Sequence, residues 1–185
     1  MSRNSGKRFS PAVTVILLFG IISLLGDMVY ESARGANSQY FNLLSVSAAQ
    51  VGLVFGIGEF LGYFLRLLAG VASDKSGKHW VFIFVGYGML LVVPLMGFTM
   101  NWSILVILIL MERIGKALRN PAKDTILSGV ADNQVGTGFA FGLQEALDQV
   151  GALLGPLIFT LVFSLTNQNG VAQYQLGYKL LFIPF

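Results

Sequence analysis

The sequence predicts an all-α membrane protein built as a bundle of transmembrane helices, and three observations lead to this fold class. Hydrophobic residues make up 55% of the 185 residues and charged residues only 11%, whereas a soluble domain carries roughly 25% charged residues. Apolar runs of about 20 residues, enough to cross a hydrocarbon core of about 30 Å, recur along the chain. The basic residues stand in short segments between those runs, as they do in the loops of membrane proteins.

Composition also excludes several classes of function. The formal net charge is +3, but the basic residues form no continuous stripe or arginine-rich arm, so we expect no nucleic-acid partner. With no cysteine and one histidine, the sequence offers no disulfide framework, thiolate site or histidine-rich metal site. It contains no phosphate-binding loop and no pairing of a nucleophile with a base, so we expect no cofactor, no metal and no enzymatic activity.

Five full spans and the start of a sixth are predicted within a single transmembrane domain over residues 1–185. The first span continues past Asp27 as far as Gly35, which can end or bend it. Pro121 is expected to break the chain after the fourth span, and residues 166–177 are typical of a polar connection. The expected spans are residues 12–35, 47–70, 80–98, 102–118 and 138–165, and the sixth starts at Tyr178. Residues 178–185 would rise only about 12 Å as a helix, so we expect the sixth span to be truncated.

The positions of lysine and arginine predict the orientation. Three basic segments fall on one side if every run spans the membrane, and the opposite loops carry no lysine or arginine except Arg34 and Lys179 at span ends. Because cytoplasmic loops carry the excess of these residues, we expect a multi-pass protein of the inner (plasma) membrane with a cytoplasmic amino terminus. The residues of the three segments are Arg3, Lys7, Arg8, Lys75, Lys78, Lys116, Arg119 and Lys123.

Charged residues inside the predicted spans are the candidate functional residues. An ionised side chain at the membrane centre costs at least about 2.5–3.5 kcal/mol, so such residues persist where they face a partner or a water-filled cavity. Several follow one another at steps of three or four, which places them on one face of a helix. We expect a shared polar centre that binds a substrate or a proton, made by Asp27, Glu31, Arg34, Glu59, Arg66, Arg113, Glu145 and Asp148.

Two interpretations of these charges remain open. Glu59 lies about 18 Å into its span, near the middle of the membrane, and Asp27 is expected at a similar depth. Because transfer out of water favours the neutral form of a carboxyl group, these two are the best candidates for a proton-binding site. The alternative is a set of static ion pairs that hold helices together, and Arg113 with Glu145 or Asp148 fits that role.

The loop after the second span carries a recognisable motif. Residues 70–79 read G-V-A-S-D-K-S-G-K-H. This segment resembles the signature G-x-L-x-D-R-x-G-R-R of the major facilitator superfamily, in which either basic residue is accepted, and Ala72 and His79 depart from it. The resemblance implies a cytoplasmic gating loop between the second and third spans. The matching residues are Gly70, Asp74, Lys75, Gly77 and Lys78.

The fifth span gives a second, partial match. Gly142, Gly151 and the pair Gly155-Pro156 resemble the antiporter motif of the same family. Phe159 and Thr160 stand where that motif has two further glycines, which weakens the inference of antiport. Glycine followed by proline is expected to bend this helix and let it move against its neighbour.

The resemblance covers the whole chain and implies both fold and function. The family has twelve helices in two six-helix halves with the substrate at the midplane between them, and this chain corresponds to the amino-terminal half. The implied function is secondary active transport of a small solute by alternating access, as proton-coupled efflux. The expected partners are membrane lipid, a small-molecule substrate and a second half, supplied by another copy or by a missing carboxy-terminal half. The alternative is a fragment without transport of its own that acts as a structural or interaction subunit.

Overall fold

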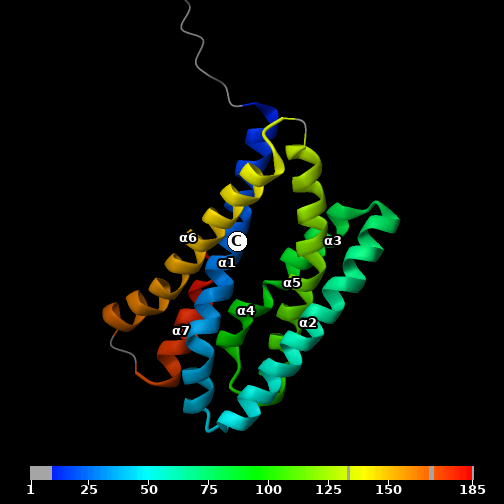
Figure 1. The fold of residues 1–185 in the computed structure, drawn as a ribbon. Helices are drawn as coiled ribbons and strands as arrows, with labels where there is room; N and C mark the ends of the chain where they lie inside the picture. Colours follow the sequence, from blue (N-terminus) through cyan, green and yellow to red (C-terminus); the bar gives the residue numbers. More distant parts are fainter. Residues whose placement is uncertain (1–9, 133, 167–168, 185) are drawn as a thin grey trace, which may run out of the picture.

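The computed structural model describes residues 10–132, 134–166 and 169–184, and Figure 1 shows that they form a bundle of helices. The all-α membrane fold is confirmed. The basic residues Arg3, Lys7 and Arg8, and Asn167 and Gln168 of the predicted polar connection, lie outside the described residues. The helices are α1 (Pro11–Leu43), α2 (Ala48–Ser76), α3 (His79–Met89), α4 (Val92–Leu95), the 3-10 helix η1 (Met96–Phe98), α5 (Trp102–Ala131), α6 (Thr137–Leu165) and α7 (Val171–Leu180).

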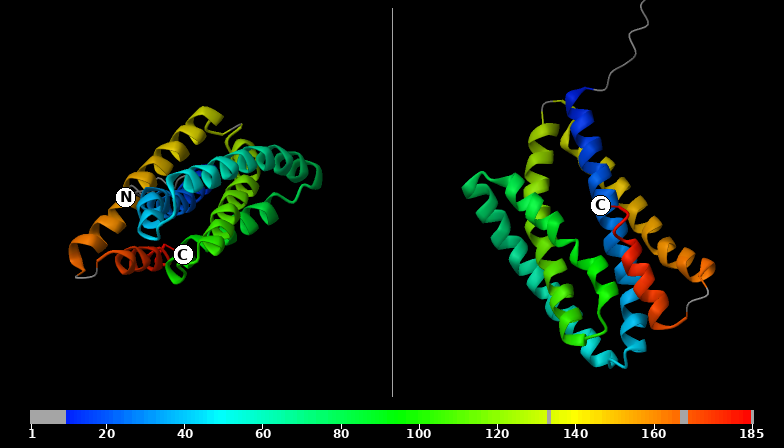
Figure 2. Two further views of the ribbon diagram at one scale, coloured as in Figure 1. Left: turned by 90° about the horizontal axis from the view of Figure 1, so that it is seen from below. Right: turned by 180° about the vertical axis from the view of Figure 1, so that it is seen from behind.

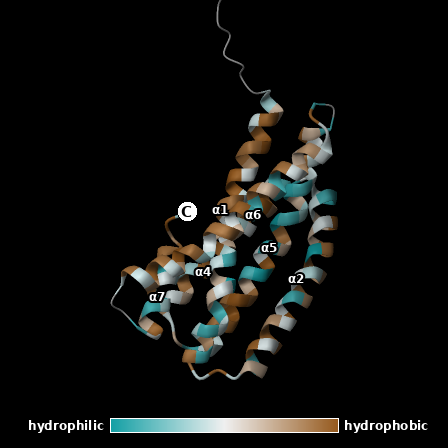
Figure 3. Ribbon diagram, turned by 60° about the vertical axis from the view of Figure 1, so that its left-hand side comes forward, coloured by the Kyte–Doolittle hydropathy of each residue, from teal (hydrophilic) through white to brown (hydrophobic). Residues whose placement is uncertain are grey.

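The helices are long and apolar enough for a membrane. Within the described ranges, four segments could span it by length and composition: Pro11–Leu43, Ala48–Ser76, His79–Phe98 and Thr137–Leu165. Helix α5 is of similar length, but charged residues interrupt its apolar sequence. In Figure 3, α5 carries hydrophilic positions, whereas the upper part of α1 is hydrophobic. Large apolar side chains cover much of the exterior, as lipid contact requires.

The bundle has two groups of helices. Helix α1 packs along α6, and α2 and α3 both pack along α5. Seen from behind in Figure 2, α1, α6 and α7 stay together on one side, and α2, α3 and α5 on the other. The space between these two groups holds the candidate site.

Local sequence signals set the ends of α1 and α2. Ser10 accepts a hydrogen bond from the backbone N–H of Val13 at 3.3 Å and so caps α1, which begins at a proline. Ser47 and Gln50 form a reciprocal capping box at the start of α2. Helix α2 ends at Gly77, whose φ of 64° is left-handed and favours glycine. These ends fix where the predicted gating loop turns.

The fourth span is longer than predicted, and the expected break at Pro121 is wrong. Helix α5 runs through Pro121 to Ala131, although proline inside a helix normally costs about 3 kcal/mol. Leu127 and Ala131 are fully buried together with Ile16 of α1 and Ala140 of α6. The burial of this second half against two other helices offsets the lost hydrogen bond, so the helix continues.

The basic residues predicted at the end of this span and in the loop after it therefore all lie on α5. Lys116, Arg119 and Lys123 project from the helix, and the last two are buried, with 4% and 6% of their surface exposed. Among the described residues of the predicted basic loops, only Lys78 lies between helices, and Lys75 lies on the last turn of α2.

The third span is also different from the prediction, because it is interrupted. Helix α3 ends at Met89, and α4 and η1 complete the segment. The interruption falls at Leu90 and Leu91. Pro94 has no N–H to donate to the carbonyl of Leu90, and its ring would clash with that carbonyl in a regular helix.

Helix α1 does not end at Gly35, as one reading of the sequence had it, but continues to Leu43. Tyr40 and Phe41, which lie beyond that glycine, are fully buried. The Tyr40 hydroxyl donates a hydrogen bond to the backbone carbonyl of Thr99 at 2.8 Å. Burial of these aromatic side chains in the core extends the helix by about two turns.

Helix α7 begins at Val171 rather than at the predicted Tyr178. Tyr178 is fully buried, and its hydroxyl donates to Oδ1 of Asn37 on α1 at 2.6 Å. Its ring packs edge-on against Phe159 of α6, with 5.2 Å between centroids. One aromatic side chain thus fixes α7 to both α1 and α6. These contacts explain why a segment of polar sequence forms a helix.

Candidate functional site

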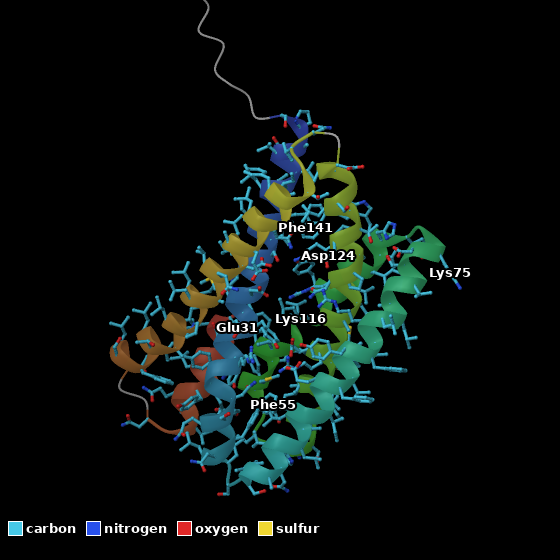
Figure 4. All side chains as sticks on the ribbon, in the orientation of Figure 1. Glu31, Phe55, Lys75, Lys116, Asp124 and Phe141 are labelled. Carbon is cyan, nitrogen blue, oxygen red and sulfur yellow. The ribbon has the colours of Figure 1, made fainter. Side chains whose placement is uncertain are left out.

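Two neighbouring cavities lie between the helix groups. The first, of about 430 Å³, is lined from α1, α2 and α5, and the second, of about 610 Å³, from α1, α2, α5 and α6. Both volumes lie in the range of about 300–1,000 Å³ that small-molecule sites occupy. Figure 4 shows Glu31, Lys116 and Asp124 in the space between the two groups, while Lys75 points away from the bundle.

All eight charged residues singled out in the sequence line one cavity or the other. Glu59 and Arg113 line the first, and Arg34 and Arg66 line both. The remaining four, which line the second, are Asp27, Glu31, Glu145 and Asp148. Their periodicity along each helix thus brings them together in space, and their binding role remains a prediction.

Arg113 is the centre of a buried cluster. Its Nη1 lies 2.8 Å from Oε1 of Glu59, and its Nε lies 3.5 Å from Oε2 of Glu112. The same Nη1 donates a hydrogen bond to the Tyr30 hydroxyl. The side chains of Arg113 and Glu112 are each 7% exposed, and a Cβ built at Gly58 would lie 3.3 Å from Cγ of Arg113. Glycine at this position gives the arginine its room.

Two further ion pairs link α5 to its neighbours. Arg119 Nη2 lies 3.9 Å from Oδ1 of Asp27 on α1, and the guanidinium also stacks over the ring of Tyr87 at 4.4 Å. Lys123 Nζ lies 3.8 Å from Oδ2 of Asp148 on α6. It also donates to the Ser23 hydroxyl of α1 at 2.9 Å. Ser23, Arg119 and Lys123 belong to the site but were not among the candidates from sequence.

The expected pairing of Arg113 with Glu145 or Asp148 is wrong, and the length of α5 explains it. Because α5 extends to Ala131, Arg113 lies 131 − 113 = 18 residues from the helix end, or about 27 Å. Asp148 lies only 148 − 137 = 11 residues from the start of α6, or about 16 Å. Lys123, 131 − 123 = 8 residues from the end of α5, is closer to that depth and forms the pair.

The other predicted charges make exposed contacts. Arg34 and Glu31 pair along α1 at 3.4 Å, and Arg66 on α2 pairs with Asp124 on α5 at 3.4 Å. Glu145 accepts a hydrogen bond from the Gln149 side chain at 2.7 Å. Exposed pairs contribute little to stability, about 0–1 kcal/mol, so these side chains can exchange partners at low cost.

The predicted gating loop lies where α2 approaches α5. A Cβ built at Gly70 would lie 3.5 Å from the Cβ of Pro121, an ordinary van der Waals distance, so the two helices are in contact here. The Asp74 carboxylate accepts a hydrogen bond from the Thr125 hydroxyl of α5 at 3.4 Å. Gly77 forms the left-handed end of α2. Lys75 and Lys78 are exposed beside it. Helix α2 thus continues to Ser76, beyond the predicted end of the second span at residue 70, and Gly70 and Asp74 contact α5 from the last turns of this helix and not from a loop.

The glycines of the fifth predicted span pack α6 onto α1. A Cβ at Gly151 would overlap the backbone carbonyl of Leu24, and one at Gly155 would overlap the carbonyl of Met28. Gly142 has open space around it. Pro156 lies inside α6, which is continuous from Thr137 to Leu165. Two of the three glycines thus serve close packing.

We expect Gly151→Ala to destabilise the protein, because the added methyl group meets the backbone of Leu24 and not a side chain that can turn away. Overpacking of this kind costs about 1–3 kcal/mol. Thermal unfolding in detergent measures the loss. The matched control is Gly142→Ala on the same helix, where nothing lies within 4 Å of the new methyl group. Equal unfolding temperatures for the two variants would contradict the proposed close contact.

Comparison with known proteins identifies the family of this chain. The sequence profile described as Major Facilitator Superfamily matches residues 9–182. A Mycobacterium tuberculosis protein described as uncharacterized is 40% identical over 153 residues, which cover 82% of this chain and 37% of that protein. A Methanocaldococcus jannaschii protein described as an uncharacterized MFS-type transporter is 33% identical over 159 residues, which cover 85% of this chain and 39% of that protein.

The chain therefore spans about two fifths of the length of the curated relatives that it matches. No solved structure gives a significant match. The profile extends over nearly the whole chain, and its bounds include the loop of residues 70–79 and the glycines of α6. This chain belongs to the Major Facilitator Superfamily.

Proposed function

We propose that this chain takes part in secondary active transport of a small solute across the plasma membrane, as proton-coupled efflux by alternating access. The observation that carries the proposal is a pair of cavities of about 430 and 610 Å³ lined by ionisable residues within a bundle of membrane helices. Charged groups at membrane depth are expensive unless they serve a pathway or are paired. The exposed ion pairs that line these cavities can open, so their charged groups are available to a solute or a proton.

Glu59 is the proposed proton carrier. Its side chain is 46% exposed and its Oε1 lies 2.8 Å from Nη1 of Arg113. A proton on Glu59 would neutralise this carboxylate and release the guanidinium to Glu112, which already lies 3.5 Å away. Asp27, 20% exposed and 3.9 Å from Arg119, is the second candidate. Exchange of one arginine between two carboxylates would couple proton binding to a change in the cavity.

The packing supports a division of labour in alternating access. Glycines hold α1 and α6 at close range. Helix α2 contacts α5 through the pair of Glu59 with the buried Arg113, and toward its end through the exposed Asp74–Thr125 hydrogen bond and Arg66–Asp124 pair. The exposed contacts cost less to break. We propose that the segment with Gly70, Asp74, Lys75, Gly77 and Lys78 acts as the gate on the cytoplasmic side, with the amino terminus also cytoplasmic.

We further propose that a second half closes the cavities, either another copy of this chain or a carboxy-terminal half. Membrane lipid would cover the remaining apolar exterior. Light scattering of the purified protein in mild detergent, with the detergent subtracted, tests self-assembly. A mass near twice 20.0 kDa supports a dimer. A mass near 20.0 kDa directs the search to a separate partner.

The experiment that tests transport is reconstitution in liposomes loaded with a pH-sensitive dye, challenged in turn with succinate, choline and sorbitol. A change of internal pH that depends on one of these solutes supports proton-coupled transport. We expect Glu59→Gln to abolish the coupled pH change, because glutamine cannot bind and release the proton. The control is Asp132→Asn, which changes an exposed carboxylate at the end of α5 that lines neither cavity.

Two results would contradict the proposal at different levels. Unchanged coupling in the Glu59→Gln protein would exclude Glu59 as the carrier and leave transport standing. No solute-dependent pH change in the wild-type protein, with any of the three solutes, would favour the alternative of a structural or interaction subunit.

A further inference from the structure

The two cavities share one edge. Only Arg34 of α1, Arg66 of α2, and Lys116 and Asn120 of α5 line both of them, among the residues that the structure describes. Three of these four side chains are cations, and the fourth carries an amide N–H₂ donor. The edge therefore presents hydrogen-bond donors from three different helices.

The charge around this edge is unbalanced on one side. The lining of the first cavity has four basic residues, Arg34, Arg66, Arg113 and Lys116, against one carboxylate, Glu59. Glu59 is already bound to Arg113, at 2.8 Å. In the second cavity the carboxylates of Asp27 and Asp148 are held by Arg119 and Lys123. The lining of the second cavity as a whole is balanced, with five basic and five acidic residues, so the excess of positive charge belongs to the first cavity, which the shared edge borders.

The three cationic side chains of the shared edge make only weak or exposed interactions. Arg34 bonds Glu31 at 3.4 Å and Arg66 bonds Asp124 at 3.4 Å, and the two arginine side chains are 60% and 45% exposed. Lys116 lies over the Tyr30 ring, with its Nζ 3.6 Å from the centroid. It makes no ion pair within 4.0 Å in the described part of the chain. The ring face attracts the ammonium group but brings no negative charge to neutralise it.

We propose that this edge binds a carboxylate or phosphate group of the transported solute, an inference that rests on the proposed function and names its substrate class. Lys116 supplies the uncommitted charge. Arg34 and Arg66 exchange their exposed carboxylate partners for the ligand, to which guanidinium groups can bind in a bidentate manner. Asn120 donates through its side-chain amide. The rest of the solute occupies the first cavity, beside Tyr63 and Gly62.

Binding to the purified full chain in lipid-depleted detergent tests this proposal apart from transport. Succinate and inorganic phosphate are titrated by calorimetry, with succinamide as the uncharged analogue of succinate. We expect the wild-type protein to bind at least one anion and not succinamide. Lys116→Gln should weaken that anion by about tenfold or more, as expected for the loss of a charge-assisted hydrogen bond.

Two matched variants make the result specific. Lys179→Gln removes a lysine that packs over Phe98 and lines neither cavity, so anion binding should be unchanged. Lys116→Arg keeps the charge and should restore most of the affinity. Size-exclusion chromatography checks that each variant is folded, and if Lys116→Gln does not fold, Arg66→Gln takes its place.

The outcomes separate the site from the function. Equal binding of succinate and succinamide, no binding of either anion, or equal losses in Lys116→Gln and Lys179→Gln would overturn the anion site. Binding of phosphatidylglycerol without binding of the soluble anions would also overturn it, in favour of a lipid headgroup. Anion binding without any proton movement in liposomes would contradict the proposed transport and leave the site standing. Choline-dependent proton movement without anion binding would overturn the anion site and support the proposed transport.

Discussion

Arg113→Gln should lower the free energy of unfolding by about 3–5 kcal/mol, the usual cost of removing one partner from a buried ion pair. The side chains of Arg113 and Glu112 are each 7% exposed, and Oε1 of Glu112 has no hydrogen-bond partner among the described residues. Glutamine in place of the arginine leaves the Glu112 charge buried without its nearest cation. Thermal unfolding in detergent, followed by tryptophan fluorescence, measures the loss.

Two comparisons isolate the electrostatic cause. Arg34→Gln removes an arginine of the same cavity whose pair with Glu31 is exposed, so its cost should stay below about 1 kcal/mol. The double variant Glu112→Gln with Arg113→Gln removes both buried charges and should recover much of the loss. If Arg113→Gln unfolds no more easily than Arg34→Gln, Arg113 does not neutralise a buried charge and the cluster needs another explanation.

The sequence predicts which residues reach the cavities because helical periodicity is local information. Asp27, Glu31 and Arg34 follow at steps of four and three, so any helix through them presents all three on one face. This holds whatever the helix packs against.

The partners of these charges could not be predicted in the same way, because pairing depends on the relative depth of two helices. Ending the fourth span at residue 118 instead of at Ala131 puts Arg113 too close to the end of the helix, and therefore at the wrong depth. The signal for the longer helix was present. Glu112, Lys116, Arg119 and Lys123 follow at steps of four, three and four, the same rhythm as in the first span.

The tolerance of proline explains why this signal was missed. Local rules count the lost hydrogen bond at Pro121 but not the tertiary burial of Leu127 and Ala131 beyond it. A similar error delays the start of α7, where the buried Tyr178 anchors a polar segment as helix. In both cases packing against α1, distant in sequence, decides the local structure.

The second large loss of stability is expected at the buried pair of Lys123 and Asp148. Lys123→Met should lower the free energy of unfolding by about 3 kcal/mol or more, because the lysine side chain is 8% exposed and Asp148 only 14% exposed. Methionine fills a similar volume, so the loss reports the charge left on Asp148 and the lost hydrogen bond to Ser23. Lys75→Met, at an exposed position in the last turn of α2, is the control and should cost little.

The double variant Lys123→Met with Asp148→Leu decides between two roles for this pair. If the ion pair only satisfies buried charges, replacing both with apolar side chains should restore or exceed wild-type stability, as other buried pairs have done. Solute-dependent proton movement in liposomes is then the informative measurement. A stable double variant that keeps proton movement would assign Lys123 and Asp148 to helix packing. A stable double variant that loses proton movement would mean that the charges of Lys123 and Asp148 are needed for the transport step itself. The gain in stability of the apolar pair would then measure what these charges cost the fold.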